Sequence, residues 1–115
     1  MRRGEVRLVD LDPARGAEAA KTGPAVVVSN DGANTTAARL GHGAVTVVPV
    51  TSHAEAVYPF QVILTAHETG LASDSKAQAE QIRSIAVSRI GRRVGHLPAA
   101  VMADLDEAIR LHLAL

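Results

Sequence analysis

The sequence contains no cysteine and no tryptophan, and it has one tyrosine and one phenylalanine. Without cysteine the chain forms no disulfides or thiolate metal sites, which fits a reducing compartment. Its core must therefore consist of valine, leucine, isoleucine and alanine. No apolar run approaches the roughly 20 residues that cross a bilayer, and the first residues lack a signal-peptide pattern. We expect a cytoplasmic protein without a membrane segment.

An excess of one charge is also missing, because the 12 Lys and Arg residues balance the 12 Asp and Glu residues. The net charge of the chain therefore gives no indication of a nucleic-acid partner. The charges are unevenly distributed, however. Residues 98–115 carry three acidic residues and one arginine, which leaves a net charge of +2 on residues 1–97. Any surface that binds an anion is expected in that larger part.

Alternating and β-branched apolar residues dominate the chain, and its 115 residues suit one domain, residues 1–115. The run Val26-Val27-Val28 after Gly23-Pro24 predicts a central strand buried on both faces. Residues 5–11, 44–51 and 58–64 predict further strands. Residues 12–22 and 30–43 predict loops, the second with a helical turn at 34–39. Pro98 predicts the start of a C-terminal helix, on which Val101, Leu105, Ala108 or Ile109, and His112 recur at helical spacing.

Residues 76–86 cannot form one regular strand. Ala77 and Ala79 share a face, but Ile82 and Ile85 do not continue that pattern, although the side-chain period of a strand is two. The chain must bulge or turn near Glu80-Gln81. Such irregularities re-aim side chains and are frequent beside functional sites.

The sequence gives little support for a metal site or for a phosphate-binding loop. The five histidines are scattered, which does not suit a metal site. Gly41-His42-Gly43 precedes a strand instead of joining a strand to a helix, so it is not a phosphate-binding loop. We expect no metal and no cofactor.

Seven segments follow one another in the chain: Arg3-Gly4-Glu5-Val6, Asp10-Leu11-Asp12-Pro13, Gly16-Ala17-Glu18, Pro24-Ala25-Val26-Val27-Val28, Val48-Pro49-Val50-Thr51-Ser52, Tyr58-Pro59-Phe60 and 76–85. This ordered set closely resembles the MazF/PemK family of toxin endoribonucleases. The resemblance covers essentially the whole chain. It implies a mostly β (α+β) fold, an SH3-like small β barrel with short helices and a C-terminal α-helix, assembled as a homodimer. It also implies metal-independent cleavage of single-stranded RNA, neutralisation by a MazE-like antitoxin, and DNA contact only through that antitoxin.

In this family an arginine just before the central strand's proline does most of the catalysis, and a threonine at the end of the Pro-containing strand holds the phosphate. Thr51 matches the threonine, although a strand-end hydroxyl bonded to backbone is the alternative. The arginine position holds Gly23. Glycine cannot donate to a phosphate or move a proton, so we predict weak or absent cleavage. The alternative is that Gly23 only relieves crowding before Pro24.

Other candidates are weaker. Glu18 matches an acidic position of the family that would orient the arginine, or it is a solvated loop charge. Lys21 could supply part of the missing charge. The remaining candidate RNA contacts are Asn34, Ser52, His53, Gln81 and Arg83. Asn34 is equally explained by turn formation, and Ser52 and His53 by exposure on the surface.

Two alternative functions stay open. One is a module that binds antitoxin or RNA without cutting. The other is a gyrase poison of the CcdB type, which shares the fold but relies on a C-terminal tryptophan segment, whereas this chain ends His112-Leu113-Ala114-Leu115.

Overall fold

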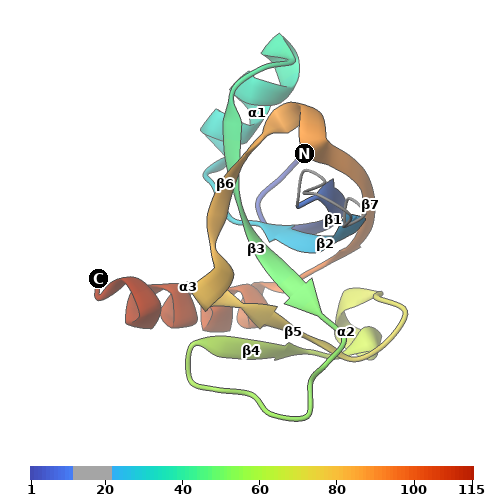
Figure 1. Ribbon diagram of the computed structural model, residues 1–115, viewed down its shortest axis with the longest axis vertical. Helices are drawn as coiled ribbons and strands as arrows, with labels where there is room; N and C mark the ends of the chain where they lie inside the picture. Colours follow the sequence, from blue (N-terminus) through green and yellow to red (C-terminus); the bar gives the residue numbers. More distant parts are fainter. Residues whose placement is uncertain (12–21) are drawn as a thin grey trace, which may run out of the picture.

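A computed structural model describes residues 1–11 and 22–115 of the chain, and Figure 1 shows their arrangement. The strands are β1 (Glu5–Asp10), β2 (Thr22–Val27), β3 (Ala44–Thr51), β4 (Gln61–Leu64), β5 (Ser75–Gln78), β6 (Arg83–Ala86) and β7 (Ile90–His96). The helices are α1 (Asp31–Leu40), α2 (Ala66–Thr69) and α3 (Ala99–Leu113), with single turns η1 (Ala79–Gln81) and η2 (Val87–Arg89).

All described strands belong to one curved antiparallel sheet in the order β4-β5-β3-β2-β1-β7, with β6 also paired to β3. Strand β2 lies in the middle of it. Val26 packs in one core cluster and Ala25 in the other, and both are fully buried. The predictions of a buried central strand and of a mostly β fold with a C-terminal helix are confirmed.

The predicted break at Glu80-Gln81 is confirmed as η1, which separates β5 from β6. Strand β3 pairs with both of them, since Thr51 lies opposite Lys76 on β5 and Val47 lies opposite Arg83 on β6. Because of this break, β3 pairs with β6 along its first half and with β5 at its end.

The prediction of a loop at residues 30–43 is wrong, because α1 occupies ten of those residues. The Asn30 side chain accepts a hydrogen bond from the backbone N–H of Ala33 at 2.8 Å and caps the helix. Gly41 ends the helix in the left-handed conformation, with φ of 71°. Asn30 and Gly41 therefore act as the caps of α1.

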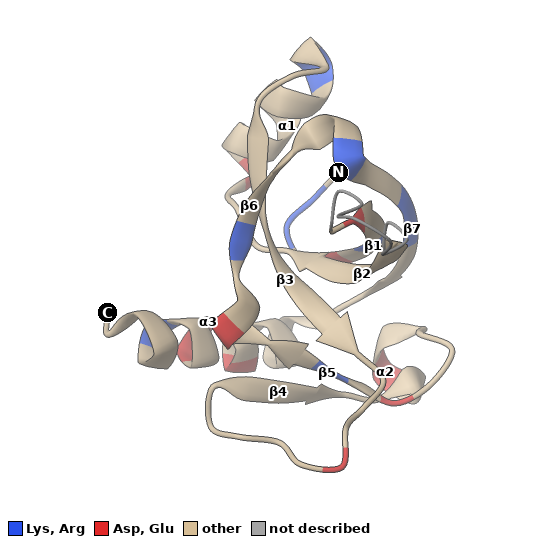
Figure 2. Cartoon of the chain, in the orientation of Figure 1, with Lys and Arg blue, Asp and Glu red and all other residues tan. Residues whose placement is uncertain are grey.

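Helix α3 begins after Pro98, as predicted, and packs on β4 and η1. Val101, Leu105 and Ala108 form its buried face, whereas His112, which shares their spacing, is exposed. Leu111, Leu113 and Leu115 expose 59%, 46% and 84% of their surface. Apolar side chains at the end of this helix and just beyond it are therefore left largely exposed in the single chain. Figure 2 shows that acidic residues gather on α3, whereas β7 is basic.

Arg3 fastens the N-terminus to two helices. Its backbone N–H donates to Asp31 at 2.6 Å, its Nε donates to the carbonyl of Val28 at 2.7 Å, and its Nη2 donates to Asp106 at 2.6 Å. The hydrogen bond from the Arg3 backbone is the main reason that the pKa of Asp31 lies below its ordinary value. The carboxylate of Asp31 thus remains ionised at neutral pH.

We expect Arg3→Ala to lower the free energy of unfolding by about 1–2 kcal/mol, because it removes a charged hydrogen bond and a half-buried ion pair. Arg110→Ala is the control, since Arg110 pairs with Glu107 on an exposed helix face, where such pairs contribute about 0.5 kcal/mol or less. Urea denaturation measures both. Equal effects of the two substitutions would show that Arg3 does not fasten the terminus.

Candidate functional site

One large groove opens between the two halves of the sheet, and we call it the inter-sheet groove. Its volume is about 1180 Å³, above the roughly 300–1,000 Å³ of most small-molecule sites. Its lining consists of Leu8, Thr22, Pro24, Val50, Thr51, Ser52, His53, Gly70, Leu71, Ala72, Ser73, Ser75, Arg92, Arg93, Val94 and Gly95. The size and the apolar floor with a polar rim suit an extended chain better than a small ligand.

The groove exists because β3 leaves β2. The two strands pair up to Ala25 opposite Pro49, after which Val50 and Thr51 pair with β5. Figure 1 shows β3 running away from β2 toward β5 and α2. The start of β2 and the end of β3 therefore form two sides of the opening.

Gly23 lies in β2 opposite Val9 of β1 and is not itself among the residues that line the groove. The pairing of β2 with β3 ends at Ala25 and Pro49, so no strand pairing joins position 23 to Thr51. The neighbours of Gly23 in the chain, Thr22 and Pro24, line the groove. Among the described residues, and apart from its two chain neighbours, a Cβ at position 23 would meet Leu11 Cδ1 at 3.8 Å, which is an ordinary contact. Relief of crowding beside Pro24 itself stays a prediction.

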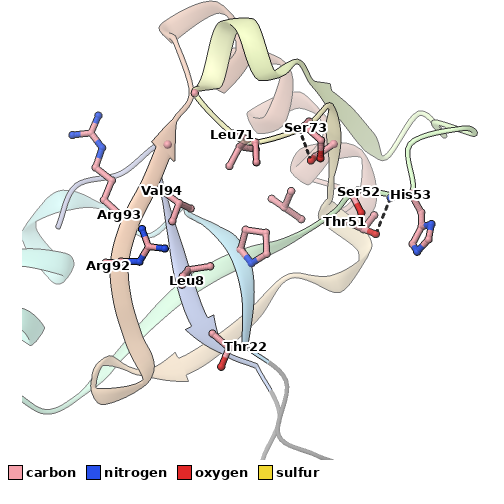
Figure 3. Close-up of a pocket in the computed structure, with 16 residues that line it drawn as sticks. Leu8, Thr22, Thr51, Ser52, His53, Leu71, Ser73, Arg92, Arg93 and Val94 are labelled. Atoms are coloured by element: carbon pink, nitrogen blue, oxygen red, sulfur yellow. Dashed lines mark hydrogen bonds between the residues drawn. The ribbon is translucent and has the colours of Figure 1, made fainter.

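Thr51, Ser52 and His53 form the rim at the end of β3 (Figure 3). Ser52 and His53 are exposed, and Thr51 is half-buried. The Thr51 Oγ1 accepts a hydrogen bond from the His53 backbone N–H at 3.2 Å. This contact orients the hydroxyl, and its hydrogen remains available to donate to an incoming oxygen.

Gln81 and Arg83 do not line the inter-sheet groove. Arg83 lies on β6 opposite Val47, four residues before Thr51 and thus about 13 Å away along the strand. Gln81 is exposed in η1. The break in the pattern was located correctly, but the residues around it lie across β3 from the groove.

Asn34 is fully buried in α1. Its Nδ2 donates to the carbonyl of Ser29 at 2.8 Å, and its Oδ1 accepts from the Ser29 hydroxyl. The side chain is occupied inside the chain, so we leave Asn34 out of the proposed RNA contacts. Glu18 and Lys21 lie outside the described residues.

The chain is similar to known proteins in both sequence and structure. The sequence profile described as "PemK-like, MazF-like toxin of type II toxin-antitoxin system" matches residues 2–113.

The chain belongs to this toxin family.

Two curated relatives and one solved structure illustrate the relationship. The chain is 65% identical over 115 residues to endoribonuclease MazF9 of Mycobacterium tuberculosis, covering 100% of the chain and 98% of the relative. It is 32% identical over 115 residues to endoribonuclease EndoA of Bacillus subtilis, covering 100% and 96%. A crystal structure of MazE-MazF from Deinococcus radiodurans is similar with a TM-score of 0.74 and 26% identity, covering 100% and 97%. The resemblance inferred from motif order is confirmed.

Sequence reasoning missed two parts of the groove lining. Arg92 and Arg93 lie on β7, and Leu71 and Ser73 lie on the connection after α2. None of these belongs to the motifs that carry the MazF/PemK resemblance. The adjacent arginines were a signal of positive charge, but only the fold shows that this charge borders the groove.

Two observations concern metals and membranes. Within residues 1–11 and 22–115, no group of three or more His, Asp or Glu side chains is placed to hold a metal ion. In the same part of the chain, no helix has the length and apolar character needed to cross a membrane.

Proposed function

We propose that this chain is a single-stranded RNA endoribonuclease toxin whose cleavage is weakened by Gly23. The observation that supports the proposal is that Thr51 and the two neighbours of Gly23, Thr22 and Pro24, line one large groove in a chain of this toxin family. Its relatives named above are endoribonucleases. The groove would hold the RNA, with Thr51 and Ser52 contacting the backbone and His53 beside them.

The chemistry follows from cleavage without a metal. The RNA 2′-OH attacks the adjacent phosphorus, the bond to the 5′-oxygen breaks, and the products are a cyclic phosphate and a 5′-OH. The protein must accept one proton, return another and stabilise charge on the phosphoryl oxygens. Thr51 can donate a hydrogen bond to that oxygen. With glycine at position 23, the cation that the family places there is missing.

The partners belong to the same proposal. The exposed Leu111 and Leu113 of α3, with Leu115 just beyond the helix, support assembly as a homodimer. A MazE-like antitoxin would hold the toxin inactive in the cytoplasm, since a relative was solved as MazE-MazF. Contact with DNA would then occur only through the antitoxin.

The test is cleavage of mixed-sequence RNA in EDTA, with protein in excess and the new ends mapped. We expect slow cleavage that leaves 5′-OH ends and that Thr51→Val slows by a further 10- to 100-fold, the worth of one hydrogen bond to a charged group.

Other outcomes separate the alternatives. Binding of RNA without any cleavage would establish the non-cleaving module, for which the glycine at position 23 is the supporting observation. If the chain neither binds nor cleaves the RNA, the proposal is refuted. Cleavage at an unchanged rate by Thr51→Val would remove Thr51 from the site.

A further inference from the structure

Four consecutive residues of β7 line the inter-sheet groove: Arg92, Arg93, Val94 and Gly95. In a regular strand only alternate residues face one side. An uninterrupted run along a groove therefore requires an irregular strand, and β7 is one.

The irregularity is visible in the register between β1 and β7. Val6 lies opposite Gly95 and Arg7 opposite Arg93, but Val9 lies opposite Ile90, with a register shift at each step. Each shift inserts an extra residue into β7, which bends the strand and turns side chains away from the regular alternation. Arg92 lies within the second of these bulges.

The bulge is held in place by specific contacts. A Cβ at Gly91 would lie 2.8 Å from the carbonyl oxygen of Leu8, closer than any side chain allows, so the strands approach there only because residue 91 is glycine. Arg7 Nη1 donates to the carbonyl of Gly91 at 3.0 Å, and Arg7 Nε donates to Glu5 at 2.9 Å.

Glu5 keeps Arg7 in this position across the neutral pH range. Burial raises the pKa of Glu5, but hydrogen bonds from the Arg7 side chain and the Arg2 backbone outweigh it, and the pKa is lowered overall. The segment that presents Arg92 is thus braced from β1 by an ionised pair.

The charge that the described residues bring to the groove is positive. Among residues 1–11 and 22–115, its lining includes two arginines and no carboxylate. Arg2, Arg3, Arg7 and Arg110 each have an acidic partner. Arg92 and Arg93 have neither an ion pair nor a side-chain hydrogen bond with any residue that the structure describes. In Figure 3 the Arg92 side chain lies on the groove side of β7 beside Val94, whereas Arg93 extends outward.

We propose that Arg92 is the phosphate-binding residue of the groove wall opposite Thr51, and that it carries RNA binding in a chain whose position 23 has no cation. The inference rests on the proposed function. A guanidinium binds two oxygens of one phosphate through its planar fork. Hydroxyls of Thr51, Ser52 and Ser73 on the far rim complete a site for a polyanion, and the apolar floor at Leu8 and Pro24 leaves room for bases.

The experiment measures binding of a fluorescein-labelled single-stranded RNA with 2′-O-methyl sugars, which cannot undergo attack by the 2′-OH. We expect Arg92→Gln to weaken binding by about 10-fold or more. The slope of log K against log salt should fall by about 0.7, the value for one lost phosphate contact on a single strand. Arg92→Lys should keep the salt slope while losing part of the affinity.

Arg39→Gln is the matched control, because Arg39 is an exposed arginine on α1, away from the groove. It should leave affinity unchanged. If the natural chain binds the probe and both glutamine variants bind equally well, this inference is overturned while the proposed function stands.

If the natural chain does not bind the probe, both are overturned. A second probe, a short glutamate-rich peptide, completes the test. Loss of peptide binding by Arg92→Gln, with RNA binding intact, would overturn the inference and assign Arg92 to an acidic protein partner.

Discussion

Gly23→Arg is expected to raise the rate of RNA cleavage by about 10²-fold or more. Removal of one preorganised donor to a developing negative charge typically costs 10²–10³ in rate, and arginine at this position would restore such a donor. The rate is measured as single-turnover cleavage of mixed-sequence RNA in EDTA, with the natural chain beside the variant.

The fold can accept this side chain. The backbone at position 23 is extended and pairs with Val9, and Gly23 is absent from the positive-φ glycines. Apart from the neighbours of position 23 in the chain, the described residues place only Leu11 Cδ1 near the added Cβ, at 3.8 Å. The neighbours Thr22 and Pro24 line the groove, so a long side chain at position 23 would start beside the opening that Thr51 borders.

Gly23→Gln supplies the control, because glutamine adds length and hydrogen-bonding capacity without charge. We expect it to cleave at nearly the rate of the natural chain. Equal rates for the arginine, glutamine and glycine proteins would mean that position 23 contributes nothing to catalysis here, and the account of a weakened toxin would be refuted. Arg92→Gln combined with Gly23→Arg should bind RNA better than Arg92→Gln alone.

The sequence predicts the parts of this fold in which local pattern and tertiary packing agree. The valines after Pro24 mark a strand buried on both faces, and the same residues pack in the core. The parity conflict between Ala79 and Ile82 requires a break, which η1 provides. Thr51, Ser52 and His53 follow a clear strand and lie on the rim of the groove.

The wall formed by β7 could not be predicted in the same way. Residues 90–96 contain two glycines and two arginines, so they show neither alternation nor an apolar run. Their strand is stabilised by pairing with β1, a contact between residues about 85 positions apart, as for Arg7 and Gly91. Local sequence does not encode such a partner.

The location of a break also does not specify the side on which its residues lie. The conflict of parity at residues 79–82 indicates that Arg83 is re-aimed. Only the pairing of β6 with the first half of β3, which sets Arg83 opposite Val47, places it away from the groove. Parity is a local property, whereas the choice between the two edges of β3 depends on the whole sheet.

Leu105→Ala is expected to lower the free energy of unfolding by about 2–5 kcal/mol, the cost of a cavity left by a large buried side chain. Leu105 is fully buried on α3 and belongs to the core cluster that includes Val6 and Leu64. It thereby joins the C-terminal helix to the first and fourth strands. Since small domains have only about 5–15 kcal/mol of stability, this substitution removes a large fraction of the total. Urea denaturation at several protein concentrations measures it.

Leu40→Ala is the matched control, because the same atoms are removed from a leucine that is 54% exposed on α1. Substitutions at such sites usually change stability by about 0.5 kcal/mol or less. Equal losses for the two variants would show that α3 does not close the core. A loss for Leu105→Ala that depends on protein concentration would show instead that the helix is stabilised largely by a second subunit. The exposed leucines at its end make that coupling physically reasonable, since they extend the same helix beyond the core that Leu105 fills.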